Sequence, residues 1–177
     1  MTRLVTSFAL LSALLCMTAP AAAQETRSIT VAAGATTLRE QPPGDFPAET
    51  YDTGWAFAVS GTFWKGLGGV FDFGANKKSN IVDEEQKLDY YLFGPRYDIT
   101  SSRWLRTYGQ VLFGRETFTE PGFSERGFAI QPGGGVDVYA WRGIGARFQV
   151  DYRITDYDEA RFKDWRVFFG GVVAIGW

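Results

Sequence analysis

The chain of 177 residues carries 18 basic and 20 acidic side chains, which gives a formal net charge of −2. This balance excludes a nucleic-acid-binding protein, because such a protein needs a strongly basic surface. The sequence has no histidine and one cysteine, so it lacks the commonest general base of enzymes and the ordinary ligands of zinc. We therefore expect neither an enzyme nor a protein that binds a cofactor or a metal.

Residues 1–23 have the pattern of an export signal. Arg3 supplies a positive start, the apolar run 4–15 is too short for a spanning helix, and three alanines at 21–23 suit cleavage. We expect the mature chain to begin at Gln24 and to form one domain over residues 24–177. Cys16 should leave with the signal, so we expect no disulfide in the exported domain.

After the signal, the sequence is typical of a series of β-strands. Apolar and polar residues alternate, and this is the period of a strand whose two faces lie in different environments. The clearest case follows residue 144, where Ala146, Phe148 and Val150 alternate with Arg147 and Gln149. The predicted strands cover residues 28–38, 54–65, 67–77, 88–99, 104–116, 126–140, 144–155 and 164–177. Most are close to the length that a tilted strand needs to cross a bilayer.

The predicted connections alternate between long and short. Long polar connections cover residues 39–53, 78–87, 117–125 and 156–163, whereas short ones lie near 66, 101–102 and 141–143. Outer-membrane barrels have short periplasmic turns and longer extracellular loops. An even number of strands then places both ends of the sheet on the side of the short turns.

The alternation alone does not show which face is the inner one. Gly94, Gly114, Gly133 and Gly135 lie on the polar face, and glycine suits the crowded interior of a narrow barrel better than a strand surface in water. Aromatic residues near the strand ends are typical of the girdles of membrane barrels. They are Trp55, Phe63, Trp64, Tyr90, Tyr91, Tyr97, Trp104, Phe128, Tyr139, Trp141, Trp165 and Trp177. The expected fold is all-β, an eight-stranded antiparallel up-and-down transmembrane β-barrel.

The inward face is predicted to hold a polar network with charges of both signs. Its members are Asp72, Arg96, Arg106, Gln110, Gln131, Asp137, Arg147, Gln149, Asp151, Arg153 and Arg166. Charges in a narrow lumen must be paired or hydrated to offset their desolvation. One interpretation is a plug of salt bridges, and the other is a gated ion path in which pairs exchange partners. We expect Arg147 and Arg153 to pair with Asp137 and Asp151.

Three segments carry a resemblance to a known family. Residues 133–138 (GGGVDV) and 145–153 (GARFQVDYR) resemble the closing strands of OmpA-like eight-stranded outer-membrane barrels, and residues 92–97 (LFGPRY) resemble their fourth strand. The resemblance implies the cell outer membrane as location. It also implies a C-terminal signal, read by the barrel-assembly machinery, at Phe169, Val173, Ile175 and Trp177. Members of the family act as structural proteins, adhesins or small gated pores.

These observations predict an integral outer-membrane barrel with a structural or surface-interaction role and a lumen plugged by salt bridges. One alternative is a small gated, porin-like channel, and another is a soluble periplasmic barrel that binds an apolar ligand as lipocalins do. Asp137 and Asp151 are the candidates for acid–base catalysis, and salt bridges are the expected role of both. We expect a monomer that contacts membrane lipid and lipopolysaccharide. Its acidic loops are expected to form a solvated, repulsive surface, and binding of Ca²⁺ or Mg²⁺ by these loops is the alternative.

Overall fold

The computed structural model describes residues 28–41, 49–79, 85–157 and 161–176. The predicted export signal and Trp177 lie outside these ranges, as do the acidic loop residues Asp45, Asp83, Glu84, Asp158 and Glu159. Within the described ranges, no helix is long and apolar enough to cross a membrane.

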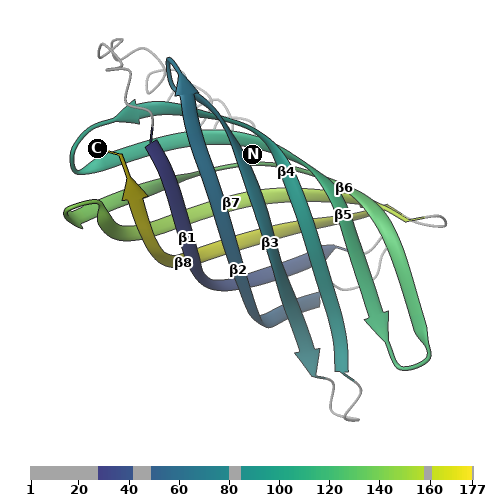
Figure 1. Ribbon diagram of the computed structural model, residues 1–177. Helices are drawn as coiled ribbons and strands as arrows, with labels where there is room; N and C mark the ends of the chain where they lie inside the picture. Colours follow the sequence, from purple (N-terminus) through teal and green to yellow (C-terminus); the bar gives the residue numbers. More distant parts are fainter. Residues whose placement is uncertain (1–27, 42–48, 80–84, 158–160, 177) are drawn as a thin grey trace, which may run out of the picture.

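The described chain forms one closed sheet of eight antiparallel strands, each paired with its neighbours in sequence, and β1 pairs with β8 (Figure 1). This confirms the predicted fold. The strands are β1 (Ser28–Gln41), β2 (Glu49–Trp64), β3 (Leu67–Ser79), β4 (Glu85–Ser101), β5 (Leu105–Glu120), β6 (Phe123–Trp141), β7 (Ile144–Asp156) and β8 (Arg161–Ile175).

The strands are longer than predicted at the end of the barrel opposite the short turns, which we call the loop end. The prediction of a long connection over residues 117–125 is wrong, because β5 and β6 pair as far as Glu120 and Phe123. Only Pro121 and Gly122 join the two strands there. Polar residues dominate this hairpin, so the apolar alternation used to set the strand ends stops before the hydrogen-bonded ladder does.

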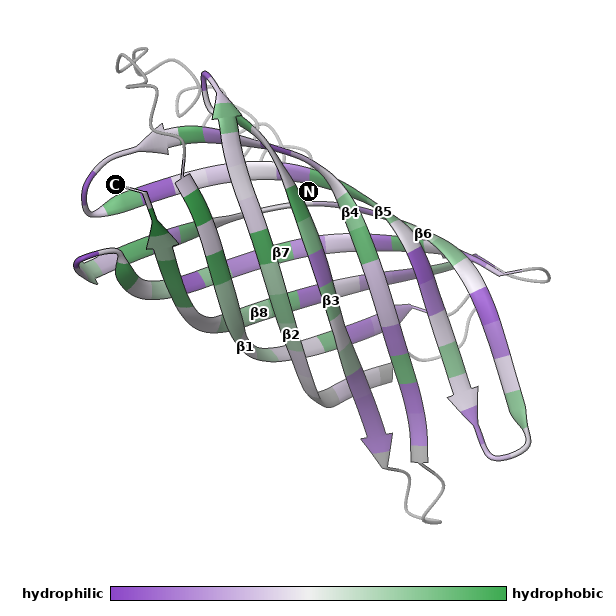
Figure 2. Cartoon of the chain, viewed as in Figure 1, coloured by the Kyte–Doolittle hydropathy of each residue, from purple (hydrophilic) through white to green (hydrophobic). Residues whose placement is uncertain are grey.

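The barrel has an apolar outside and a polar inside. Phe93, Phe148 and Phe169 are 63%, 51% and 65% exposed on the outer wall, whereas Arg153 and Asp151 inside are 0% exposed. Figure 2 shows hydrophilic positions gathered toward the loop ends of β3 and β4. A lipocalin-like barrel needs the opposite arrangement, with an apolar interior, so the alternative of a soluble ligand-binding barrel is wrong.

Two residues that were predicted to belong to the aromatic girdle lie elsewhere. Tyr90 and Tyr139 are 0% and 2% exposed and point into the lumen. In β4 the neighbours Leu88 and Leu92 are buried, whereas Tyr91 is 60% exposed. The assignment of both tyrosines to the girdle, which relied on their nearness to a strand end, is therefore wrong. Their position in the alternation places them inside the barrel.

The opposite end of the barrel is closed by three short turns, and we call this edge the turn rim. Lys65 and Gly66 join β2 to β3 with φ angles of 44° and 83°, and Arg142 and Gly143 join β6 to β7 with 44° and 78°. Positive φ at both central residues identifies these as type I′ hairpin turns. In the third turn, between β4 and β5, the Ser102 hydroxyl accepts a hydrogen bond from the Leu105 amide over 3.1 Å.

Candidate functional site

The lumen is the candidate site, because the alternation of all eight strands directs polar side chains into it. The predicted network residues are each 5% exposed or less inside the barrel: Asp72, Arg96, Arg106, Gln110, Gln131, Asp137, Arg147, Gln149, Asp151, Arg153 and Arg166. They come from six strands, β3 to β8. The structure divides their contacts into three clusters along the lumen.

The first cluster lies nearest the turn rim and centres on Asp137 of β6. The Arg147 guanidinium donates two hydrogen bonds to the Asp137 carboxylate, over 2.7 and 2.9 Å. Arg96 donates to Asp98 over 3.0 Å and lies 3.5 Å from Asp137. The Tyr139 hydroxyl donates to Asp137 over 3.3 Å. Hydrogen bonds between a guanidinium and a carboxylate are stronger than those between neutral groups, so Asp137 connects three strands firmly.

Arg106 extends the first cluster toward β1. It donates from Nη1 to the Thr30 hydroxyl over 3.0 Å, and its Nε lies 3.8 Å from Asp98. The Thr62 hydroxyl donates to Asp98 over 2.9 Å. Strands that are not neighbours in the sheet are therefore linked through the lumen as well as around the wall.

The second cluster lies in the middle of the lumen around Arg166 of β8. Arg166 contacts Asp72 over 2.5 Å and Asp151 over 2.7 Å, so one guanidinium bridges two carboxylates. It also donates to the Tyr90 hydroxyl. Gln149 donates its amide to both oxygens of Asp151, over 3.1 and 2.9 Å. The extra donor satisfies the second carboxylate, which a single arginine neutralises only in part.

The third cluster lies nearest the loop end around Glu116 of β5. Arg153 forms a salt bridge with Glu116 and donates from Nε to Gln131 over 2.8 Å. The hydroxyls of Thr155 and Tyr157 each donate to Glu116 over 2.9 Å. Burial, followed by the neighbouring Glu116 carboxylate, raises the pKa of Tyr157 far above its ordinary value, so this hydroxyl remains a donor.

Tyrosine rings separate the arginines along the lumen. The Tyr108 ring has the Arg96 guanidinium 3.5 Å from its centroid and that of Arg147 at 5.1 Å. The Tyr90 ring has Arg153 at 4.1 Å. These cation–π contacts offset part of the hydration that the arginines lose in the narrow lumen. Sequence reasoning missed Tyr90 here, because its neighbour Tyr91 made the pair look like part of a girdle.

The two expected ion pairs have different outcomes. Arg147 and Asp137 are register partners on β7 and β6 and pair as expected. Arg153 does not pair with Asp151, because β8 places Arg166 directly opposite Asp151. Arg153 instead reaches across the lumen to β5. Arg153 and Asp151 are two positions apart on the same face of β7. A residue on another strand is often nearer than a residue two positions along the same strand.

A further acidic residue in the lumen, Asp164 of β8, escaped the prediction. It is 1% exposed and lies opposite Arg153 in the strand register. Its position two residues before Arg166 places it on the inward face. The alternation could have found it, because the predicted strand includes residue 164 as its first position. In the observed strand, which begins at Arg161, Asp164 lies well inside the ladder.

Inward-facing glycines provide the space that these side chains fill. A Cβ atom on Gly135 would lie 2.5 Å from the Tyr108 hydroxyl, and one on Gly74 would lie 2.5 Å from the Tyr90 hydroxyl. Each buried tyrosine therefore lies against a wall position with no side chain. In the middle of the lumen, no space large enough for a water molecule remains between Ala56, Ala58, Asp72, Arg147, Gln149, Arg166 and Phe168.

Comparison with solved structures shows the same architecture in bacterial outer-membrane proteins. Neisserial surface protein A has a TM-score of 0.65 at 11% identity, covering 84% of this chain and 97% of that one. OprG of Pseudomonas aeruginosa has a TM-score of 0.58 at 11% identity, covering 87% of this chain and 98% of that one. Ail, the attachment invasion locus protein of Yersinia pestis, has a TM-score of 0.55 at 17% identity, covering 83% of this chain and 99% of that one. Neither a protein-family model nor a curated protein matches the sequence.

The chain has the fold of an eight-stranded outer-membrane β-barrel protein. The resemblance to OmpA-like barrels seen in three sequence segments thus extends to the whole described fold. The location follows from the same observations, since a closed barrel with apolar side chains outside and charges inside is stable in a bilayer. The protein is a component of the cell outer membrane.

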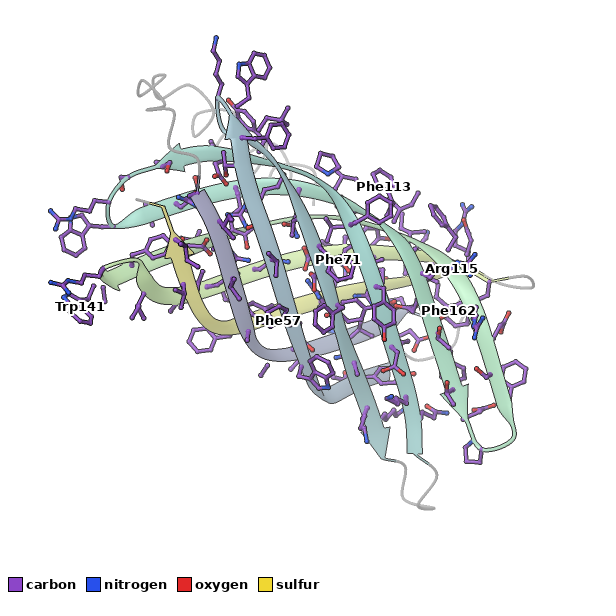
Figure 3. All side chains as sticks on the ribbon, viewed as in Figure 1. Phe57, Phe71, Phe113, Arg115, Trp141 and Phe162 are labelled. Carbon is purple, nitrogen blue, oxygen red and sulfur yellow. The ribbon has the colours of Figure 1, made fainter. Side chains whose placement is uncertain are left out.

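The outer wall of this outer-membrane barrel is rich in aromatic contacts. Phe73 of β3 lies 5.2 Å from Phe57 and 5.7 Å from Phe71 between ring centroids. It also packs edge-on against Trp55 at 6.0 Å. Figure 3 shows Phe57 and Phe71 along the wall and Trp141 at the turn rim. These rings cover the wall between the rims, as the lipid-facing surface of the fold requires.

The predicted assembly signal lies on the closing strand of the outer-membrane barrel. Phe169, Val173 and Ile175 are 65%, 44% and 60% exposed on the outer face of β8. Val173 and Ile175 are register partners of Val31 and Ile29 on β1. Trp177 lies outside the described residues, and recognition of these positions by the assembly machinery stays a prediction.

The candidate catalytic carboxylates are both engaged by arginines. Asp137 is bound by Arg147, and Asp151 is bound by Arg166. Within the described ranges, no group of three or more histidine, cysteine, aspartate or glutamate side chains is placed to hold a metal ion. Asp156, one of the acidic loop residues, forms a salt bridge with Arg161.

Proposed function

We propose that this protein is a non-catalytic, structural barrel of the outer membrane whose lumen is closed by its own salt bridges. The observation that carries the proposal is the buried ionic network. The described lumen holds five buried arginines and six buried carboxylates: Arg96, Arg106, Arg147, Arg153 and Arg166 with Asp72, Asp98, Glu116, Asp137, Asp151 and Asp164. Every one of these arginines forms a salt bridge with a carboxylate on another strand.

The arrangement of these pairs supports a closed lumen. Arg96 connects Asp98 to Asp137, and Arg166 connects Asp72 to Asp151. Removing one partner of a buried pair leaves an uncompensated charge, which costs about 3–5 kcal/mol. A path for ions would require several linked pairs to separate together. Side chains of this size also fill the interior of an eight-stranded barrel.

Planar-bilayer recording tests the closed lumen directly. We expect the full chain, inserted at high copy number, to give no discrete conductance steps above those of the lipid alone, because the three clusters close the lumen. Heat-dependent gel migration of the same sample serves as the control that the barrel has folded. Regular steps from a folded sample would rule out the closed lumen as the resting state.

The second candidate function is a narrow gated channel, and a separate observation favours it. Both amide atoms of Gln110, Nε2 of Gln131 and one carboxylate oxygen of Asp164 are buried and have no hydrogen-bond partner among the described residues. Buried polar atoms of this kind normally bind ordered water. A partly hydrated lumen would conduct when pairs exchange partners, and Arg147→Ala or Asp151→Ala would then change the conductance.

We also propose that the loop end contacts lipopolysaccharide, whose phosphate groups are anionic. Arg115 and Arg126 are exposed on neighbouring strands of the outer wall, directly beyond Phe113 and Phe128. Figure 3 shows Arg115 farther toward the loop end than Phe113. Guanidinium groups bind phosphates well at the edge of an apolar band. The Ail protein is named for attachment and invasion, and an adhesive role for the present loops is part of this proposal.

A further inference from the structure

A repeated pair of residues marks the turn rim. Each of the three turns places a tryptophan next to a basic residue, and the cation lies over the indole ring. The pairs, with the distance from cation to ring centroid, are Lys65 over Trp64 (5.5 Å), Arg103 over Trp104 (5.4 Å) and Arg142 over Trp141 (5.0 Å). The same combination therefore occurs in every hairpin of this rim.

The three pairs lie on the outer surface of the barrel and not in its lumen. The indoles are 57%, 58% and 63% exposed at Trp64, Trp104 and Trp141. Lys65 and Arg142 are exposed as well. Figure 3 shows Trp141 projecting from the end of the barrel. Exposed aromatic rings at this level are expected at the boundary between hydrocarbon and headgroups.

The backbone conformation of two of these basic residues is unfavourable. Lys65 and Arg142 both have a φ of 44°. This angle lies in the left-handed region, which residues other than glycine, asparagine and aspartate avoid. Type I′ turns normally place asparagine, aspartate or glycine at this position. A lysine and an arginine thus occupy the two equivalent positions where asparagine, aspartate or glycine would be more stable. Strain kept at matching sites is a sign of function.

The turn rim also has charge of one sign. Among the described residues of the three turns and the strand ends beside them, the acidic residue is Asp98, which is buried in the lumen and bound by Arg96. The loop end differs, because Lys87 is paired with Asp89 and Arg161 with Asp156. The positive charge of the turn rim is therefore not neutralised by exposed carboxylates of the described chain.

We propose that the turn rim binds the headgroups of anionic phospholipids through its three tryptophan–cation pairs. The indole reaches the boundary of the apolar wall, so the cation beside it lies at the level of the lipid phosphates. The pairs are spread over three separate hairpins and border lipid-facing residues such as Phe63 and Ile144, which are 61% and 49% exposed. A ring of lipids fits this distribution, whereas a single protein partner would need a compact patch.

The inference rests on the proposed function, because the rim meets lipid headgroups only if the barrel spans a membrane. Short turns lie on the periplasmic side of such barrels. The binding would then anchor the protein in the inner, phospholipid leaflet and fix its depth. Lipopolysaccharide contacts at the loop end would act on the other leaflet.

The test measures lipid preference with the full chain in phosphatidylcholine bilayers that contain spin-labelled phosphatidylglycerol or spin-labelled phosphatidylcholine. Electron paramagnetic resonance gives the ratio of the two association constants at the protein surface. We expect the Lys65→Asn, Arg103→Asn, Arg142→Asn triple variant to lower the preference for phosphatidylglycerol about threefold relative to wild type. Asparagine is favoured at a positive φ, so this variant keeps its turns.

The matched control is the triple variant Lys65→Arg, Arg103→Lys, Arg142→Lys, which changes the same positions and keeps their charge. It should retain the wild-type preference. An asparagine variant with an unchanged preference, or an equal loss in the charge-preserving variant, would refute the inference. Heat-dependent migration of every sample separates this result from the proposed function. A folded barrel without lipid preference overturns the inference alone, whereas failure of the wild type to form a barrel overturns both.

Discussion

Single glycines decide how much charge the lumen can hold. Gly133 of β6 faces inward, and a Cβ atom there would lie 1.9 Å from the Asp151 carboxylate and 2.8 Å from the Val150 carbonyl oxygen. Gly171 of β8 faces outward and has open space in the same direction. The alternation places the two glycines on opposite faces, and only the inward one makes room for a lumenal side chain, that of Asp151.

This contrast predicts that the same substitution has different effects at the two positions. Gly133→Ala should lower the free energy of unfolding by about 1–3 kcal/mol, because the Asp151 side chain is held by Gln149 and Arg166 and cannot move aside. Gly171→Ala should change it by less than about 0.5 kcal/mol or raise it, since glycine weakens a strand. Urea titration of both variants in lipid vesicles measures the difference, and equal losses would contradict this account of the lumen.

Pairs of neighbouring strands are joined by ionic contacts as well as by the backbone ladder. The Arg147 and Asp137 side chains lie opposite each other on β7 and β6 and share two hydrogen bonds. Both are at most 1% exposed. In such a place the attraction between the charges must offset the loss of hydration of each one, and the partner is essential because the charge cannot reach water.

A double-mutant cycle on this hairpin should show strong coupling. Arg147→Met or Asp137→Leu alone leaves the other charge buried, and we expect each to destabilise the barrel by about 3–5 kcal/mol. The double variant should lose clearly less free energy of unfolding than the sum of the losses in the two single variants. Denaturant unfolding monitored by tryptophan fluorescence gives the three values, and simple additivity would mean that the two side chains act independently.

At the scale of the whole molecule, closure of the sheet is the dominant feature. β1 and β8 pair along their length, from Ile29 with Ile175 at the turn rim to Gln41 with Lys163 at the loop end. No strand of the described barrel is therefore left with an unpaired edge. A closed ladder cannot lose one strand without exposing backbone groups, so the barrel should unfold as one unit.

Gel migration provides the test of this cooperativity. The protein kept at room temperature in dodecyl sulfate should migrate as a compact band, and boiling should convert it completely to a slower or faster band with no intermediate. The reason is that detergent binds the outer wall without breaking the hydrogen-bonded ladder. Identical migration with and without boiling would contradict a closed barrel.

The alternation of apolar and polar residues predicted most of the fold and part of the candidate site. It identified eight strands, the outward direction of Phe93 and Phe148, and the inward direction of Arg147 and Asp137. These features depend only on the two-residue period of a strand and on whether each position is apolar or polar, and both can be read directly from the sequence. It failed where strands run on into polar residues, as in the hairpin that turns at Gly122.

The chain by itself determined that it folds as a lipid-facing barrel with charges inside, because a strand in a bilayer must show apolar residues to lipid and direct its polar ones into the lumen. Only the tertiary structure decided which charges meet. Arg153 turned out to bind Glu116 and not Asp151, and Tyr90 turned out to lie between arginines. Those partners are set by the register and curvature of a closed sheet, which bring together residues that are far apart in sequence.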